Sequence, residues 1–233
     1  MKTVAIIPAR AGRNRIPRKN IKPFLGKPII GYSIEAALQS GLFDKVIVST
    51  DDVEITTVAK DCGAEVPFVR PAELSEDFSG TGSVVKHCLE WLKKQGFQPE
   101  FACCIYATAP FVQVRFLKEG LHRLVEAPDK AYAFSVTSFP FPIQRAIRIN
   151  REGNVEAFHP EMVPVRSQDL EEAYHDAGQF YWGRTEAFLN DETIFSPSSL
   201  PIILPRYLVQ DIDTQEDWKR AELMFAALKG GTV

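Results

Sequence analysis

Short apolar runs alternate with amphipathic segments along most of this chain. Runs rich in Val, Ile and Ala predict buried strands, whereas apolar residues spaced three and four apart predict helices. The expected strands are Thr3–Ile7, Val46–Val48, Ala64–Val69, Phe101–Tyr106, Ala131–Thr137, Ala177–Trp182 and Ile202–Leu204. The expected helices are Pro28–Ser40, Val53–Cys62, Ser79–Gln95, Gln113–Glu126 and Thr214–Lys229. Repeated strand–helix–strand units of this length predict an α/β fold with a mostly parallel sheet and helices on both faces.

The alternation stops between residues 138 and 172. Four prolines interrupt this stretch: Pro140, Pro142, Pro160 and Pro164. Ile143–Ile149 and Asn154–Phe158 predict a hairpin that turns at Glu152 and Gly153. The stretch does not fit another strand–helix unit, so it packs on the sheet or reaches a second subunit. We expect one domain over residues 1–233, with 138–172 as an elaboration within it.

Composition limits the classes of protein to consider. A chain of 233 residues with 45% hydrophobic content can bury the core of one domain. Its net charge of −3 argues against a general nucleic-acid coat. No apolar run reaches the roughly 18 residues of a membrane span, and Pro8 and Arg10 interrupt any signal-peptide pattern. Four cysteines lack the spacing of a zinc site, so we expect reduced thiols in a cytoplasmic protein: Cys62, Cys88, Cys103 and Cys104.

A basic loop follows the first predicted strand directly. It contains Gly12 and five cations within ten residues: Arg10, Arg13, Arg15, Arg18 and Lys19. It matches neither the Walker motif nor the dinucleotide fingerprint. A solvated basic turn is one interpretation. The position at the carboxyl end of a strand, where open α/β sheets bind ligands, and the slightly acidic charge of the whole chain favour a phosphate site instead.

Two carboxylates near the end of the chain suggest a metal site. Asp211 and Asp213 are two residues apart, and alternate side chains of an extended segment share a face, so both can reach one cation. Carboxylate and triphosphate oxygens together suit Mg²⁺. Alternatively, Asp213 or Thr214 caps the last helix and Asp211 is merely exposed. The basic loop makes the metal interpretation the better one.

Other polar residues give weaker signals. Arg70 lies in a loop just beyond a predicted strand, and Arg166 in the irregular stretch could bind a substrate carboxylate with a bidentate fork. His175 and Asp176 are adjacent, but the chain has no serine elbow or catalytic cysteine signature to complete a triad.

The order of several short motifs resembles the CMP-sialic acid synthetase family over nearly the whole chain. These motifs are Ile7–Arg10, Gly12, Arg15–Pro17, Lys19–Asn20, Val48–Asp51, Arg70–Leu74, Thr108–Pro110 and Asp211–Thr214. Within that family, Phe134–Pro140 and His175–Trp182 resemble the branch that acts on pseudaminic acid.

The resemblance implies a Rossmann-like, three-layer nucleotide-diphospho-sugar transferase fold and a homodimer with an interlocking dimerisation segment. It also implies a cytidylyltransferase reaction. CTP and a nine-carbon nonulosonic acid would give the CMP-sugar and pyrophosphate, as the anomeric hydroxyl attacks the α-phosphate with help from Mg²⁺.

The same resemblance implies roles for individual residues. Those implied in catalysis are Arg10, Arg15, Lys19 and Asp211. Those implied at the nucleotide are Pro8, Ala9, Arg10, Gly12, Arg13, Asn20, Arg70, Ser79 and Thr81. Those implied at the sugar are Tyr106, Gln144, Arg166, His175, Asp176 and Phe180, with Arg166 facing the carboxylate. Asp211 and Asp213 would hold the metal.

Three departures from the family pattern bear on substrate and rate. Arg13 and Asn14 stand where the family has Ser and Lys, so the loop lysine is missing; Arg13 or Arg15 could supply its charge, with the different geometry and reach of a guanidinium. Tyr106 replaces a glutamine that contacts the sugar, which argues against ordinary sialic acid as substrate. Asp176 replaces an asparagine in the sugar pocket.

Several alternatives stay open at the level of sequence. N-acetylneuraminic or legionaminic acid could be the substrate without any change of mechanism, and a smaller keto sugar is a third possibility. A protein of another class, a nucleotide binder that has lost turnover, is compatible with the altered loop. Retention of both Asp211 and Asp213 argues against such a binder.

Overall fold

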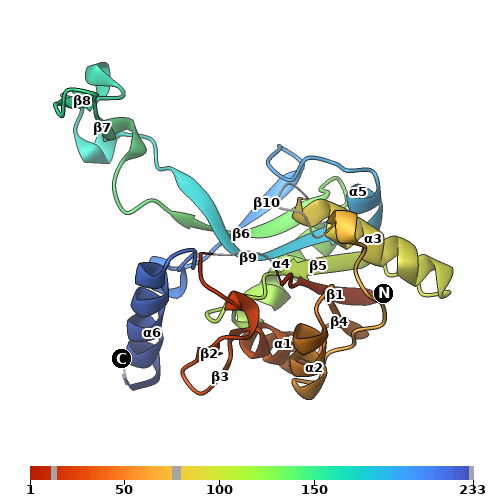
Figure 1. Ribbon diagram of the computed structural model, residues 1–233. Helices are drawn as coiled ribbons and strands as arrows, with labels where there is room; N and C mark the ends of the chain where they lie inside the picture. Colours follow the sequence, from red (N-terminus) through yellow and green to blue (C-terminus); the bar gives the residue numbers. More distant parts are fainter. Residues whose placement is uncertain (12–14, 75–79, 231–233) are drawn as a thin grey trace.

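A single mixed sheet organises the molecule. The computed structural model describes residues 1–11, 15–74 and 80–230, and within them six strands pair in the order β10–β6–β9–β5–β1–β4 (Figure 1). Their bounds are β1 Thr3–Pro8, β4 Lys45–Ser49, β5 Phe101–Ile105, β6 Tyr132–Ser138, β9 Tyr174–Arg184 and β10 Ser199–Ile203. Strand β1 is parallel to β4 and β5, and β10 is parallel to β6, whereas β9 is antiparallel to both of its neighbours. The prediction of a mostly parallel sheet is confirmed.

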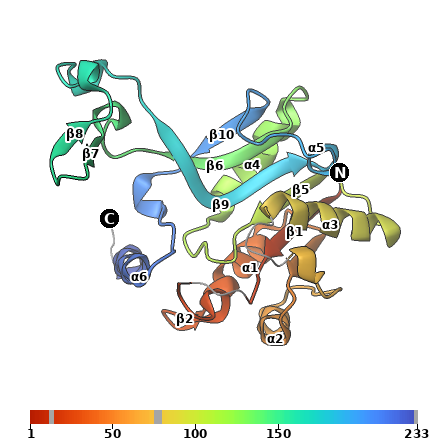
Figure 2. The ribbon, with the colours of Figure 1, turned by 45° about the horizontal axis from the view of Figure 1, so that its top comes forward.

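Helices cover both faces of this sheet, as Figure 2 shows. Their bounds are α1 Ile29–Ser40, α2 Val53–Asp61, α3 Thr81–Lys94, α4 Val114–Glu126, α5 Thr185–Leu189 and α6 Gln215–Gly230. Successive strand residues point to opposite faces, so Ile7 joins a core with α1 and α4, whereas Ile6 joins a second core with α3 and α5. The predicted three-layer arrangement is therefore present. Within the described residues, no helix combines the length and the apolar character needed to cross a bilayer.

One predicted strand is wrong. In place of a strand over Ala64–Val69 there is a single parallel bridge between Ile47 and Glu65. The N–H of Glu65 donates to the carbonyl of Val46 at 2.8 Å, and the N–H of Val48 donates to that of Glu65 at 2.9 Å. Pro67 has no N–H with which to continue the ladder, so pairing ends there.

A small aromatic core fixes α6 beside the body of the molecule. Phe24, in the short hairpin of β2 (Pro23–Phe24) and β3 (Lys27–Pro28), meets Trp218 edge-on with ring centroids 5.5 Å apart. Phe225 also packs against the ring of Phe24, with centroids 5.5 Å apart. Sequence patterning did not predict this hairpin, because it is only two residues long on each side. The packing of this hairpin against α6 positions the segment before the helix, and that segment contains the candidate metal ligands Asp211 and Asp213.

Residues 138–172, here called the arm, project from the sheet between β6 and β9 (Figure 1). The predicted hairpin is confirmed, with shorter strands than expected: β7 Ile147–Ile149 and β8 Val155–Ala157. Several large apolar side chains of the arm are exposed: Phe141, Ile147, Ile149, Val155 and Phe158. Exposed apolar side chains gathered on one projection indicate a surface for association.

Candidate active site

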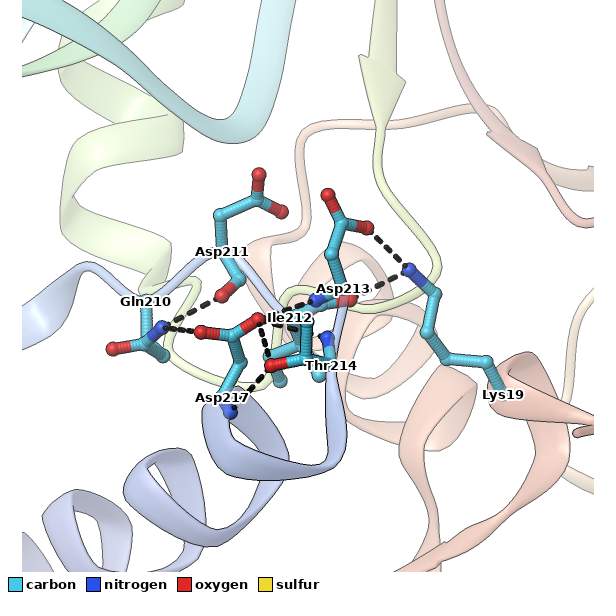
Figure 3. Close-up of polar contacts among 7 residues, drawn as sticks. All are labelled: Lys19, Gln210, Asp211, Ile212, Asp213, Thr214 and Asp217. Carbon is cyan, nitrogen blue, oxygen red and sulfur yellow. Dashed lines mark hydrogen bonds and ion pairs between the residues drawn. The ribbon is translucent and has the colours of Figure 1, made fainter. Parts of the chain in front are cut away.

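Two segments that are distant in the sequence, one at Lys19 and one at Ile212 and Asp213, meet near the carboxyl edge of the sheet. Lys19, in the 3₁₀ turn after the basic loop, donates from Nζ to the carbonyl of Ile212 at 2.6 Å and to Oδ1 of Asp213 at 3.1 Å (Figure 3). The Lys19 side chain is only 15% exposed. The structure therefore brings a predicted catalytic cation together with the predicted metal ligands.

Asp211 and Asp213 present their carboxylates on the same side of the segment, as Figure 3 shows. The pKa of Asp211 is raised. The first cause is partial desolvation of its carboxylate by the surrounding protein, and the second is the nearby Asp213. The residue is nevertheless exposed at the surface. A carboxylate in such a position is stabilised by a bound cation. This donor set fits a hard divalent cation whose remaining ligands come from a triphosphate.

Helix capping does not occupy these two carboxylates. Thr214 Oγ1 accepts the N–H of Asp217 at 3.2 Å, and Asp217 Oδ2 accepts the N–H of Thr214 at 2.8 Å and that of Asp213 at 3.1 Å. This reciprocal arrangement caps α6. The alternative that Thr214 caps the helix is confirmed, and Asp217, which the sequence analysis did not single out, completes the cap.

The nucleotide side of the site begins at the end of β1. Ala9 donates its N–H to the carbonyl of Ser49 at 2.9 Å, and Asn20 Nδ2 donates to the carbonyl of Arg10 at 2.9 Å. These bonds hold the start of the loop, after Pro8, against β4 and the 3₁₀ turn. Arg15 is exposed at the far end of the loop. The predicted residues Gly12, Arg13 and Ser79 lie outside the described residues.

Arg70 is buried and connects its loop to the end of β4 through Ser49. Its Nε donates to Oγ of Ser49 at 3.1 Å, another guanidinium nitrogen donates to the Ser49 carbonyl, and only 4% of the residue is exposed. Burial lowers the pKa of Arg70 to about 10, and Asp51 opposes that effect. Its position behind the end of β4 places it at the predicted edge of the sheet. Because Arg70 is buried and bonds to Ser49, it helps to fix the conformation of the loop, in addition to any contact with a ligand.

A chain of hydroxyl groups connects the predicted nucleotide and sugar residues. Tyr106 interacts with Thr81 and packs against Tyr181 with ring centroids 5.2 Å apart, and the hydroxyl of Tyr181 donates to Oδ2 of Asp176 at 2.5 Å. Burial raises the pKa of Tyr106 and, with the help of Tyr106 itself, that of Tyr181. Both phenols therefore stay protonated and can donate, so the chain orients the Asp176 carboxylate. Tyr181 was not predicted, because its place on a strand resembles that of a core residue.

A bulge in β9 makes this contact possible. The pairing of β6 with β9 is interrupted between Phe134 and Val136, and Gly178 adopts a left-handed φ of 62°. Oγ of Ser135 accepts the N–H of Phe180 at 3.1 Å, which satisfies a backbone group that the bulge removes from the ladder. Bulges redirect side chains near active sites, and glycine makes the left-handed turn without strain.

His175 lies just before the bulge. Its Nδ1 donates to the carbonyl of Asp176 at 2.8 Å, and its ring packs against Phe139 with centroids 4.7 Å apart. This bond fixes the tautomer and leaves Nε2 as an acceptor.

A cavity of about 650 Å³ lies between the ends of β6 and β9, the 3₁₀ turn η6 (Arg206–Leu208) and α6. Its walls include His175, Asp176, Asp211, Arg206 and Arg220. The first three were predicted site residues. The two arginines were missed, because each is a lone cation in an otherwise ordinary segment.

Four predicted sugar residues do not line this cavity in the single chain: Tyr106, Gln144, Arg166 and Phe180. Phe180 is fully buried in the core on the α1 and α4 face, and its assignment to the sugar pocket stays a prediction. The bulge turns its side chain away from the site. Gln144 and Arg166 lie in the arm, where Gln144 Nε2 donates to the Glu171 carbonyl at 2.9 Å and Arg166 Nε donates to Oδ2 of Asp169 at 2.7 Å.

The sequence of the chain matches known cytidylyltransferases. The family model described as Cytidylyltransferase matches residues 4–222. A pseudaminic acid cytidylyltransferase from Campylobacter jejuni is 47% identical over 225 residues, which are 97% of each chain. A CMP-N,N'-diacetyllegionaminic acid synthase from Legionella pneumophila is 29% identical over 95% of each chain.

A solved structure gives the same fold. The CMP:2-keto-3-deoxy-manno-octonic acid synthetase complexed with CTP superposes with a TM-score of 0.70 and covers 98% of this chain and 100% of its own. The two sequences are 18% identical, so this likeness concerns the fold alone.

Proposed function

Because the chain belongs to the cytidylyltransferase family, we propose that it couples CTP to a nine-carbon nonulosonic acid, with pseudaminic acid as its substrate. The observation that carries the choice of sugar is the 47% identity, over 97% of both chains, to a pseudaminic acid cytidylyltransferase. The anomeric hydroxyl of the sugar attacks the α-phosphorus of CTP. The new oxygen–phosphorus bond forms, the bond to the bridging oxygen breaks, pyrophosphate leaves and the hydroxyl proton is released.

This chain's residues act mainly by alignment and by balancing charge. Arg10, Arg15 and Lys19 place positive charge at the carboxyl edge of β1, where the triphosphate would lie. Pro8, Ala9 and Asn20 shape the loop, and Arg70 and Thr81 stand on the cytidine side. Gly12, Arg13 and Ser79 complete the proposed nucleotide site. Lys19 also holds Asp213 in place, since its Nζ bonds both that carboxylate and the Ile212 carbonyl.

We assign Asp211 and Asp213 as the ligands of a Mg²⁺ ion. When bound, the ion neutralises negative charge on the reacting phosphate. The support for this assignment is the shared orientation of the two carboxylates and the raised pKa of Asp211, first from desolvation and then from Asp213.

We further propose that residues 1–233 are one cytidylyltransferase domain that works as a homodimer, with the arm serving as dimerisation and sugar-site elaboration. The exposed apolar side chains of the arm support this, because such a surface is stabilised when a second copy covers it. Gln144 and Arg166 would then approach the sugar site of the partner.

We place the reaction in the cytoplasm, where reduced cysteines persist; all four cysteines are free.

The test is pyrophosphate release by the purified protein with CTP and Mg²⁺. Pseudaminic, legionaminic and N-acetylneuraminic acids are compared at equal concentration. Release that is fastest with pseudaminic acid supports the proposal. Preference for either of the other sugars keeps the cytidylyltransferase and overturns the choice of substrate. Absence of release with all three, together with measurable CTP binding, would favour a nucleotide binder without turnover.

A further inference from the structure

Two arginines without an assigned role share the cavity with Asp211. Arg206 comes from η6 and Arg220 from the second turn of α6. The acidic walls of the same cavity are Asp176 and Asp211. Asp176 already accepts hydrogen bonds from the N–H of Gly178 at 2.8 Å and from the Tyr181 hydroxyl at 2.5 Å. Arg220 interacts electrostatically with Asp217, so Arg206 is the better candidate to balance the charge of an anionic ligand.

The backbone that carries Arg206 is firmly anchored. The N–H of Leu204 donates to the carbonyl of Val136, and Thr137 Oγ1 donates to the carbonyl of Leu204, both at 2.8 Å. On the other side of Arg206, the buried Gln179 donates from Nε2 to the carbonyl of Leu208 at 2.6 Å. Anchors before and after Arg206 fix where its side chain begins, which is what a specific contact requires.

The guanidinium itself keeps most of its donors. Among the described residues its contacts are long ones from Nη1, at 3.4 Å to Oγ of Ser138 and at 3.5 Å to the carbonyl of Phe139. A guanidinium has five N–H donors in a planar fork that matches a carboxylate. The other arginine with a proposed role at the sugar, Arg166, donates from Nε to Asp169 at 2.7 Å within the arm.

We propose that Arg206 binds the carboxylate of the sugar acid from within its own subunit. This assignment rests on the proposed function. In a nonulosonic acid the carboxylate and the attacking hydroxyl are attached to the same carbon. A fork on the carboxylate therefore orients the nucleophile as well as holding the substrate. Arg220 adds positive charge to the opposite side of the cavity, beside α6.

The experiment compares each sugar acid with its methyl ester, which lacks the negative charge. Wild type is measured beside Arg206→Gln, Arg206→Lys, Arg166→Gln and the control Arg123→Gln. Arg123 is a suitable control because its guanidinium also donates to a backbone carbonyl, that of Pro201 at 2.6 Å, from α4. The readouts are kcat and KM for sugar and for CTP, and the melting temperature of each variant.

Arg206→Gln should lower kcat/KM for the acid by about 10- to 100-fold, the range of a hydrogen bond to a charged group. It should leave kcat/KM for the ester and KM for CTP nearly unchanged. The preference for acid over ester would therefore collapse. Arg206→Lys should recover part of it, because charge is kept but the fork is lost. Arg123→Gln should behave as wild type.

Three results would overturn the assignment. The acid-to-ester preference could survive Arg206→Gln, or it could collapse only in Arg166→Gln, which would assign the carboxylate to the arm. A loss in Arg206→Gln that is equal for acid and ester would indicate a structural role. If wild type turns over none of the three sugar acids, the proposed function fails first, and that failure is seen without any variant.

Discussion

At the scale of single residues, Asp211 is the most direct test of the site. Asp211→Asn removes one of two carboxylates that share a face, and it should reduce pyrophosphate release by at least about 100-fold because preorganised charge at the phosphate is lost. The melting temperature should not fall, since partial desolvation and the nearby Asp213 disfavour the charged form of the carboxylate that is replaced. Asp129→Asn, an exposed acid paired with Lys130, is the control. A variant with wild-type turnover would remove Asp211 from the reaction.

Two glycines in helices give a matched test of packing. A Cβ at Gly120 of α4 would lie 2.7 Å from Cδ1 of the buried Trp182, whereas a Cβ at Gly82 of α3 meets nothing within 4 Å. Gly82→Ala should raise the free energy of unfolding by up to about 1 kcal/mol through helix propensity. Gly120→Ala should lower it by about 1–2 kcal/mol, because overpacking outweighs the same gain. Denaturant unfolding measures both, and equal signs would contradict the packing described.

The sequence alone predicted those site residues that combine a suitable functional group with a position next to a recognisable strand or helix. Lys19 and the pair Asp211 and Asp213 belong to this class, and the structure joins them although Lys19 and Asp213 are 194 residues apart. The face that Phe180 occupies could not be predicted, because strand alternation does not reveal a bulge, and a bulge changes the face on which a side chain lies. Arg206 was missed because its significance lies in a cavity built from four separate segments. The family resemblance is confirmed by the match over residues 4–222.

At the scale of elements, the cap of α6 determines where the metal ligands lie. Asp217→Asn weakens the bonds to the N–H groups of Thr214 and Asp213, and it should lower the free energy of unfolding at neutral pH by about 0.5–2 kcal/mol. Glu216→Gln, in the same turn, controls for loss of charge at the helix N-terminus. Thermal unfolding at several pH values measures both variants.

The same cap predicts the pH dependence of that loss. Hydrogen bonds from Thr214 lower the pKa of Asp217 in the folded protein. A carboxyl with a lowered folded pKa stabilises fully above its unfolded value of about 4, and this contribution disappears as pH falls through the folded value. The difference between wild type and Asp217→Asn should therefore vanish in acid. A difference that stays constant down to low pH would show that charge is not involved.

The predicted elements succeeded where local pattern and long-range pairing agree. The helices that became α1, α2, α3, α4 and α6 were found with ends shifted by no more than two residues. Ala64–Val69 had the composition of a strand, but Pro67 limits it to one bridge. Strand β9 is longer than expected, because its first residues, from Tyr174, pair with β6 beyond the bulge. Neither outcome could be derived from hydrophobic pattern alone.

At the scale of the whole molecule, the arm should control the oligomeric state. Ile149 and Val155 are 76% and 65% exposed on the arm hairpin. Replacing both with Glu should convert a dimer into a monomer, since charge on an apolar contact surface opposes association. Val53→Glu alters an 83% exposed valine on α2 and serves as the control. Light scattering after size exclusion distinguishes the species. A dimer that survives the double substitution would place the interface elsewhere.

Mixing two variants, each with a lesion in a different part of the proposed site, tests whether the arm completes the site of the partner subunit. Asp211→Asn damages the cavity, and Arg166→Gln damages the arm. If each site combines the cavity of one subunit with the arm of the other, a mixed dimer has one site with both lesions and one intact site. Random re-association of equal amounts should then restore about a quarter of wild-type sites, because half of the dimers are mixed. If the arm serves its own chain, every site of the mixed dimer keeps one lesion and activity stays low. Full activity of Arg166→Gln alone would instead show that Arg166 does not contribute to the site.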